Sequence, residues 1–237
     1  MSSEIKLYTL PFAGGSSFSY MPWKKYINSN IKLINLDYPG HGKRIKSSLI
    51  KNFSDVVLDI VEQIQNDNKK KTPFIIYGHS MGGMIAYLSS VILTNRNMCP
   101  SKVIIGACRC PEKFSNDSKQ EDNYASIVEE LLQGNRITEQ IAKSQEFNTI
   151  VYPIIKNDFE MMRDCDVSQL KKQKLNNEII CLYGENDKTV QHLDVIGWND
   201  YTEKNFICKK IKSGHFFVED NAKEVCEYIN ELIVSSY

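Results

Sequence analysis

The chain has 237 residues, which suits one domain of the larger kind better than two independent ones. Hydrophobic residues make up 42% and charged residues 24%, a balance that is ordinary for a globular protein and excludes a disordered or fibrous chain. Lysine plus arginine and aspartate plus glutamate both number 29, so the zero net charge recommends neither nucleic acid nor an anionic membrane as a partner.

Residues 1–6 contain Glu4 and lead into only a brief apolar stretch, so we expect no secretory signal. No apolar run approaches the roughly 20 residues of a membrane-spanning helix, and we expect a cytoplasmic protein. The seven cysteines are odd in number and scattered, which favours reduced core thiols. Their one close pair, Cys108 and Cys110, lacks paired histidines nearby and makes a poor zinc site, so we expect neither a metal nor a cofactor.

Apolar, β-branched runs alternate with longer amphipathic runs, the pattern of a mostly parallel sheet covered by helices. In chain order, the expected strands are Ile5–Leu10, Ile31–Leu36, Phe74–Tyr77, Val103–Ala107, Ile179–Tyr183 and Phe206–Ile211. The expected helices are approximately Phe53–Asn66, Met81–Thr94 and Ala222–Val234. The sequence therefore predicts a single α/β domain over residues 1–237.

Residues 112–170 interrupt this alternation, because they show helical periodicity and contain no convincing strand. We interpret them as a helical insertion between two strands of the sheet. The segment has 12 acidic and 6 basic residues, so its net charge is minus six and the rest of the chain carries plus six.

The run from Phe74 to Gly83 reads as a buried strand that ends in G-x-S-x-G, with Ser80 at its centre, and then opens into a helix. A serine on such a sharp turn is held in a strained conformation that exposes its hydroxyl above the sheet. The flanking glycines are needed because side chains there would collide with the neighbouring backbone. We therefore predict that Ser80 is a catalytic nucleophile, with the N–H of Met81 aimed at the oxyanion.

A serine nucleophile needs a base, and in this kind of fold the acid and then the histidine follow it in the chain. Of the four histidines, His215 lies just after the final strand and is the predicted base. His192, in a helix-like run, is the alternative. His79 should point away from the serine hydroxyl and is assigned a packing or hydrogen-bonding role, and His41 is interpreted as a loop residue.

The acid is expected where the strand Ile179–Tyr183 leads into a turn, which favours Asp187 as the residue that orients His215. Glu185, two residues earlier, is the rival. Three further carboxylates in the insertion are interpreted as surface or helix-end charges: Asp158, Asp164 and Asp166. A second oxyanion donor is expected from the glycine-rich loop after the first strand, at the backbone N–H of Ala13 or, one residue away, of Phe12.

Several segments together resemble the type II thioesterases that accompany non-ribosomal peptide and polyketide synthases. They are Leu10-Pro11-Phe12-Ala13-Gly14-Gly15 followed by Trp23, Leu36-Asp37-Tyr38-Pro39-Gly40 with Arg44, Gly78-His79-Ser80-Met81-Gly82-Gly83, Tyr183-Gly184 with Asp187, Trp198, and Gly214-His215-Phe216-Phe217. The resemblance covers nearly the whole chain and implies an α/β-hydrolase fold. His41 departs from it, since the family often has arginine after Pro-Gly.

The resemblance further implies that the insertion is a lid over an acyl chain. The substrate would be an acyl or peptidyl group held as a thioester on the phosphopantetheine of a carrier protein, or a small acyl thioester, and we expect a monomer. Carrier proteins are usually acidic, so basic residues outside the insertion are candidate docking groups. Two sets qualify: Lys43, Arg44 and Lys46, and Lys209, Lys210 and Lys212.

The triad alone does not name the reaction, because Ser-His-Asp chemistry cleaves oxygen esters and thioesters alike. An acyltransferase that passes the acyl group from Ser80 to an amine or alcohol would use the same residues. A non-catalytic carrier-binding module is the other alternative, and the intact triad argues against it.

Overall fold

In the computed structural model, the described residues are 4–114, 128, 129, 131, 132, 134, 136–165, 167 and 173–234. Their centre is a parallel six-stranded sheet with the strand order β2-β1-β3-β4-β5-β6. The strands are β1 (Ile5–Leu10), β2 (Ile31–Asn35), β3 (Phe74–His79), β4 (Lys102–Gly106), β5 (Glu178–Gly184) and β6 (Phe206–Ile211). All six lie where the sequence predicts them, with ends shifted by at most two residues, and the predicted α/β architecture is confirmed.

Helices and helical turns connect these strands. They are η1 (Ser17–Lys25), η2 (Gly42–Arg44), α1 (Phe53–Asp67), α2 (Met81–Asn95), α3 (Pro111–Phe114), α5 (Glu139–Ala142), η3 (Phe147–Val151), α6 (Tyr152–Arg163), α7 (His192–Val195), η5 (Ile196–Tyr201), α8 (Phe217–Asp220) and α9 (Ala222–Val234). α1 shows why such segments form where they do: the Asn52 side chain accepts hydrogen bonds from the first free N–H groups, and an apolar face follows.

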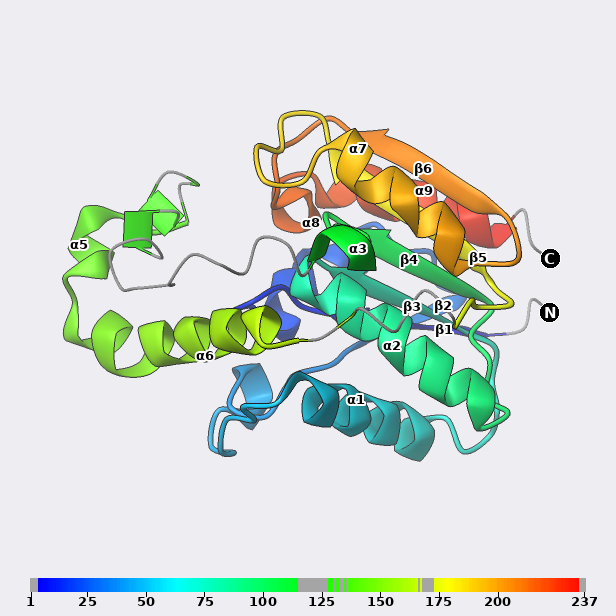
Figure 1. Ribbon diagram of the computed structural model, residues 1–237, viewed down its shortest axis with the longest axis horizontal. Helices are drawn as coiled ribbons and strands as arrows, with labels where there is room; N and C mark the ends of the chain where they lie inside the picture. Colours follow the sequence, from blue (N-terminus) through cyan, green and yellow to red (C-terminus); the bar gives the residue numbers. More distant parts are fainter. Residues whose placement is uncertain are drawn as a thin grey trace.

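Helices cover both faces of the sheet, so it is buried on both sides. Successive strand residues point to opposite faces, and each face therefore has its own apolar cluster. On one face, Tyr8 and Ile76 pack in a cluster with α1 and α2. On the other face, Leu7 and Ile75 pack with η1, α8 and α9. Figure 1 shows the resulting arrangement, with α1 and α2 below the strands and the red C-terminal helix behind their upper edge.

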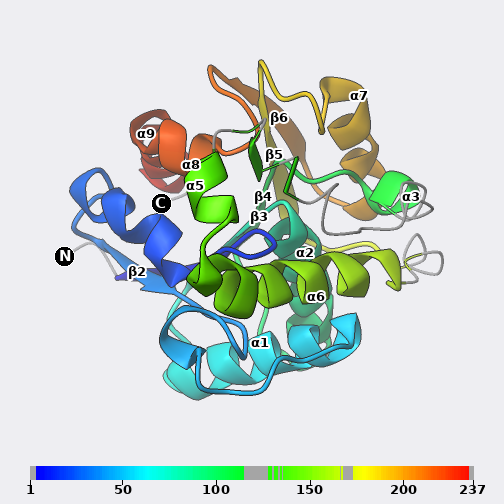
Figure 2. The same ribbon diagram turned by 90° about the vertical axis from the view of Figure 1, so that its left-hand side faces the viewer.

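Where the segment predicted as a helical insertion is described, it consists of helices joined by turns and irregular residues and contains no strand. Its elements α5, η3 and α6 project beyond the body of the protein in Figure 1, and α6 crosses the end of the molecule that faces the viewer in Figure 2. Asp166, one of the three carboxylates that the sequence analysis considered in this segment, lies outside the described residues. Within the described part of the chain, no helix is long and apolar enough to cross a membrane.

Candidate active site

Ser80 lies on the sharp turn between β3 and α2, with a left-handed φ of 53° and a ψ of −118°. This strained conformation is maintained by its surroundings, since the Ser80 N–H donates to the carbonyl of Gly106 on the neighbouring strand at 2.7 Å. A Cβ atom on Gly78 would overlap the carbonyl of Gly82, and one on Gly82 would overlap that of Leu10. The glycines of the motif are thus required by close backbone approach.

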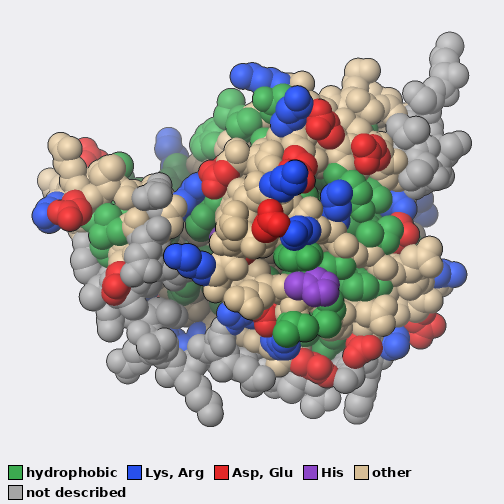
Figure 3. Space-filling view, turned by 90° about the horizontal axis from the view of Figure 1, so that it is seen from above, with side chains coloured by type: hydrophobic (Ala, Val, Ile, Leu, Met, Phe, Trp, Pro, Cys, Tyr) green, Lys and Arg blue, Asp and Glu red, His purple; other side chains and the backbone are tan. Residues whose placement is uncertain are grey.

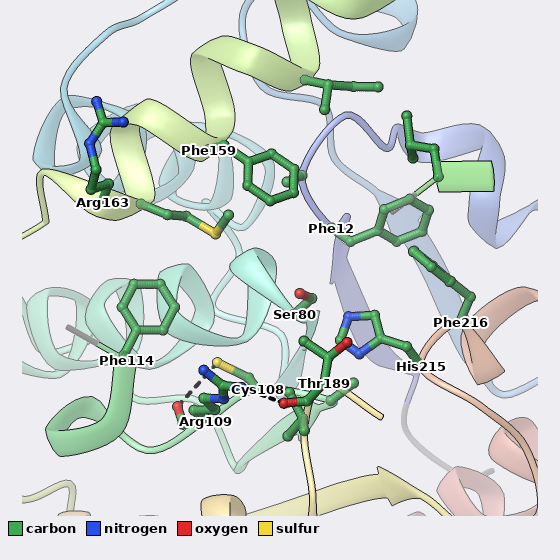
Figure 4. Close-up of a pocket in the computed structure, with 16 residues that line it drawn as sticks. Phe12, Ser80, Cys108, Arg109, Phe114, Phe159, Arg163, Thr189, His215 and Phe216 are labelled. Atoms are coloured by element: carbon green, nitrogen blue, oxygen red, sulfur yellow. Dashed lines mark hydrogen bonds between the residues drawn. The ribbon is translucent and has the colours of Figure 1, made fainter. Parts of the chain in front are cut away.

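His215 and Asp187 come from the loops that follow β6 and β5, at the carboxyl edge of the sheet where Ser80 also lies. The His215 Nδ1 atom is 2.7 Å from Asp187 Oδ2. The other carboxylate oxygen of Asp187 accepts the backbone N–H groups of Thr189 at 2.8 Å and Val190 at 2.9 Å, which fixes the carboxylate. With Nδ1 occupied by Asp187, Nε2 is left for Ser80, which lies beside the His215 ring in Figure 4.

The rival residues named in the sequence analysis lie elsewhere. Glu185 is exposed and pairs with Lys210 at 2.5 Å, an interaction that lowers the pKa of the Glu185 carboxyl. His192 begins α7, is exposed and packs against the Tyr183 ring. Asp164 follows α6 and contacts Arg163 at 3.4 Å on an exposed surface.

His79 contacts the backbone of His215, the predicted base. Its Nε2 atom lies 2.8 Å from the backbone carbonyl of His215, and Nδ1 lies 3.0 Å from the Tyr77 hydroxyl. Complete burial and the nearby His215 side chain hold the pKa of His79 well below its ordinary value, so the ring is neutral. The neutral ring donates from Nε2 and accepts from Tyr77, in agreement with the hydrogen-bonding role that the sequence suggested.

The interpretation of Asp158 as a surface charge was wrong. Its side chain is fully buried, and Oδ2 lies 2.9 Å from His41 Nε2 and accepts the Gly14 N–H at 2.7 Å. His41, interpreted only as a loop residue, is 3% exposed and takes part in this buried pair. The helical register could have revealed Asp158, because it occupies a core-facing position of α6 together with Ile155 and Met161.

The glycine-rich loop after β1 contributes Phe12 and Ala13 to the pocket around Ser80. The loop is folded back on itself, since the Gly15 N–H donates to the Phe12 carbonyl at 2.9 Å. Met81 directly follows Ser80 and is the first residue of α2, and the first N–H groups of a helix have no partner within it. Ala13 lines the same pocket as Ser80, so both predicted oxyanion donors belong to segments that contain or border the predicted nucleophile.

A cavity of about 290 Å³ opens above Ser80 and His215. Figure 4 shows Phe159 and Arg163 of α6 on one side of it, Phe114 of α3 on another, and Phe12 and Phe216 close together near His215. Its lining is mostly apolar, which suits a hydrocarbon chain. Cys108 also lines the cavity, but burial raises the pKa of its thiol, so it does not compete with Ser80 as a nucleophile.

Arg136 joins the segment before α5 to the loop that carries His215, a contact that the sequence analysis missed. Its guanidinium lies 4.2 Å from the centre of the Phe216 ring. It also pairs with Glu219 and lies 3.5 Å from Asp220 Oδ1 in α8. In the sequence, Arg136 is one of two arginines within an acidic segment, which does not predict a partner.

The chain matches the Thioesterase domain family over residues 5–233, nearly its whole length. It belongs to this family. The thioesterase is thus a hydrolase that acts on thioester bonds, as the sequence predicted.

Named relatives of this thioesterase match over almost its whole length. It is 24% identical over 224 residues to the probable anguibactin biosynthesis thioesterase AngT of Vibrio anguillarum, covering 94% of this chain and 89% of AngT. It is 26% identical over 232 residues to the medium-chain S-acyl fatty acid synthase thioesterase of Homo sapiens, covering 94% and 84%. The crystal structure of ClbQ from the colibactin NRPS/PKS pathway superposes with a TM-score of 0.87 at 28% identity, covering 98% of both chains. The predicted α/β-hydrolase fold is confirmed.

Three of the basic residues considered as docking groups of the thioesterase have intramolecular partners: Arg44, Lys210 and Lys209, whose Nζ atom lies 5.4 Å from the centre of the Tyr228 ring. Arg44 binds both carboxylate oxygens of Asp59, at 2.5 and 2.8 Å, and Lys210 pairs with Glu185. Lys43, Lys46 and Lys212 are exposed. On the face over β6 and α7, seen from above in Figure 3, basic and acidic side chains are interspersed and do not form a block of one sign.

Proposed function

We propose that this thioesterase hydrolyses acyl groups from the phosphopantetheine thioester of carrier proteins in non-ribosomal peptide or polyketide biosynthesis. Ser80 is the nucleophile, His215 the general base and Asp187 the residue that orients it, with Ala13 and Met81 as oxyanion donors. The observation that carries the proposal is the contact between His215 Nδ1 and Asp187 Oδ2 at 2.7 Å, beside Ser80 at the base of an apolar cavity. The similarity to the anguibactin biosynthesis thioesterase AngT and to ClbQ of the colibactin NRPS/PKS pathway supports the biosynthetic setting.

The reaction follows from these positions in two steps. His215 Nε2 removes the Ser80 proton as Oγ attacks the thioester carbon. The oxyanion of the tetrahedral intermediate then accepts hydrogen bonds from the N–H groups of Ala13 and Met81. Collapse breaks the C–S bond, and the phosphopantetheine thiolate leaves with the proton from His215. Water activated by the same ring then attacks the acyl-Ser80 ester, which releases the carboxylic acid and restores the serine hydroxyl.

Substitution of the nucleophile tests this mechanism. Ser80→Ala is expected to lower kcat by up to about 10⁶-fold on an acyl-carrier substrate. Ser89→Ala is a matched control, because the Ser89 hydroxyl is buried in α2 and has no hydrogen-bond partner among the described residues. Full activity in Ser80→Ala would end the catalytic proposal. Mass analysis of products with added amines or alcohols separates hydrolysis from acyl transfer.

Carrier docking is tested by charge reversal at exposed lysines near the site. Lys43 lies two residues from His41, and Lys212 lies three residues before His215. Lys43→Glu and Lys212→Glu should raise KM for acyl-carrier and leave a small soluble acyl thioester unaffected. Lys70→Glu, an exposed lysine between α1 and β3, is the control. Equal effects on both substrates would contradict docking at these lysines.

A further inference from the structure

Two different segments hold the oxyanion loop, which we define as residues 11–17. The Tyr38 hydroxyl donates to the carbonyl of Pro11 at 2.8 Å, at one end of the loop. At the other end, Asp37 accepts the N–H of Ser17 at 2.6 Å and its hydroxyl at 2.8 Å. Both ends are therefore held by residues that directly follow β2, in the body of the protein.

The middle of the loop is held from α6. The Gly14 N–H donates to Asp158 Oδ2 at 2.7 Å. Gly14 has a φ of 71°, and a Cβ atom on it would overlap Ile155, which lies one helical turn before Asp158 on the same face of α6. α6 thus packs directly on Gly14, the residue next to Ala13.

In the part of the chain that the structure describes, the hydrogen bonding of the buried Asp158 carboxylate is incomplete, which is unfavourable for a residue that only stabilises the fold. A buried carboxylate is costly unless donors compensate for its lost hydration, and Asp158 is fully buried. Oδ2 receives the Gly14 N–H and His41 Nε2, whereas Oδ1 is buried without a hydrogen-bond partner among the described residues. Both hydrogen-bond contacts of the carboxylate are thus made by one oxygen, Oδ2, which faces Gly14 of the oxyanion loop and the His41 ring.

We propose that Asp158 is a positioning residue that holds Gly14, and with it the Ala13 N–H, in the orientation that receives the oxyanion. The inference rests on the proposed function of Ser80 and its loop. An oxyanion donor acts only when it is correctly aimed before the charge develops. The Ala13 N–H is therefore correctly oriented only while α6 is packed on the oxyanion loop. The position of α6 that encloses the acyl chain is thus also the one that assembles the oxyanion site.

Asp158→Ala tests this role by removing the acceptor, and Asp158→Asn restores one, since an amide oxygen also accepts the Gly14 N–H. We expect Asp158→Ala to lower kcat by about 10- to 100-fold, with KM changed less than about threefold. Asp158→Asn should recover kcat to within about fivefold of the wild type. Glu160→Ala is the matched control on the same helix, because Glu160 is half exposed and contacts only Lys156, at 3.7 Å, among the ion pairs described.

Binding of two inhibitors separates positioning from a general structural effect. An alkylboronic acid forms a tetrahedral adduct with Ser80, whereas the matching N-alkyl amide binds the acyl cavity without forming one. Asp158→Ala should weaken binding of the boronic acid by the same factor by which it lowers kcat, and should leave the affinity for the amide unchanged. Should this variant fold poorly, Asp158→Leu, whose side chain has the same number and branching of heavy atoms but no acceptor, allows the same measurement.

Two outcomes would overturn the inference: equal weakening of both inhibitors, or a kcat for Asp158→Ala equal to that of Glu160→Ala. The proposed function has its own test. Thioester hydrolysis by the wild type that disappears in Ser80→Ala supports it whatever the Asp158 variants do. A wild type without that activity would refute the proposed function before the inference is reached.

Discussion

The His79 ring donates a hydrogen bond to the backbone carbonyl of His215, with Nε2 and the oxygen 2.8 Å apart. The residue next to the proposed nucleophile thereby holds the loop that carries the proposed base. This contact joins the last residue of β3 to the loop after β6, and the two residues are 136 positions apart in the chain.

Loss of this hydrogen bond should affect turnover more than binding. His79→Phe removes the donor, and we expect kcat to fall about tenfold with KM little changed. The variant loses the hydrogen bond that positions His215, whereas the His215 side chain itself is unchanged. His79→Gln, whose amide nitrogen can donate in the same direction, should recover part of the loss. His192→Phe is the matched control, since His192 is exposed on α7. Equal activities of the two Phe variants would contradict a positioning role for His79.

Asp187→Asn should lower kcat by about 10³- to 10⁴-fold. The amide no longer stabilises the imidazolium, and its N–H₂ group favours the wrong tautomer of His215. Glu185→Gln, two residues away, should stay within about twofold of the wild type, because Glu185 pairs with Lys210 on the surface. The measurement is steady-state hydrolysis of one acyl thioester by both variants. A larger loss of kcat in Glu185→Gln would mean that Glu185, and not Asp187, orients His215.

The length of the acyl chain should be limited by Phe159, which lines the cavity from α6. While the chain still fits, each added CH₂ should improve kcat/KM by about fourfold, corresponding to about 0.8 kcal/mol of burial. Phe159→Ala should shift the optimum toward longer chains, and Phe159→Leu by less. The test is kcat/KM over a series of straight-chain acyl thioesters. An unchanged optimum would show that another part of the lining limits the chain.

His41 should make stability depend on pH. Burial lowers the pKa of His41, but the hydrogen bond and charge of Asp158, with smaller contributions from the Pro39 carbonyl and Asp37, outweigh it and raise the pKa above its ordinary value. The protonated ring therefore stabilises the folded state fully below the unfolded pKa of about 6.5, and this contribution is lost as pH rises through the higher folded pKa.

Denaturant unfolding of the wild type and His41→Gln from pH 5.5 to 9 measures this contribution. The wild type's advantage in free energy of unfolding should be largest at the acid end and decrease toward the alkaline end. An advantage that is constant, or that grows with pH, would mean that His41 is not protonated in the folded protein.

The sequence by itself determined the features that depend on neighbouring residues. The turn around Ser80 follows from Gly78 and Gly82, because backbone lies too close for any side chain there. The strands are visible as short apolar runs, and in a parallel sheet all their carboxyl ends lie at one edge. The positions of Asp187 and His215 after two strands therefore predicted that they would meet near Ser80, and the described geometry has the two in contact.

Only the tertiary structure decided which partners the buried charged residues contact. Asp158 lies 117 positions from His41 and 144 from Gly14, and its sequence neighbours do not reveal either partner. Arg136 reaches α8 and Arg44 reaches α1 in the same way. Such pairs depend on how α6 and the loops pack on the sheet, and the free energy of a buried charge is set by those surroundings, not by its place in the chain.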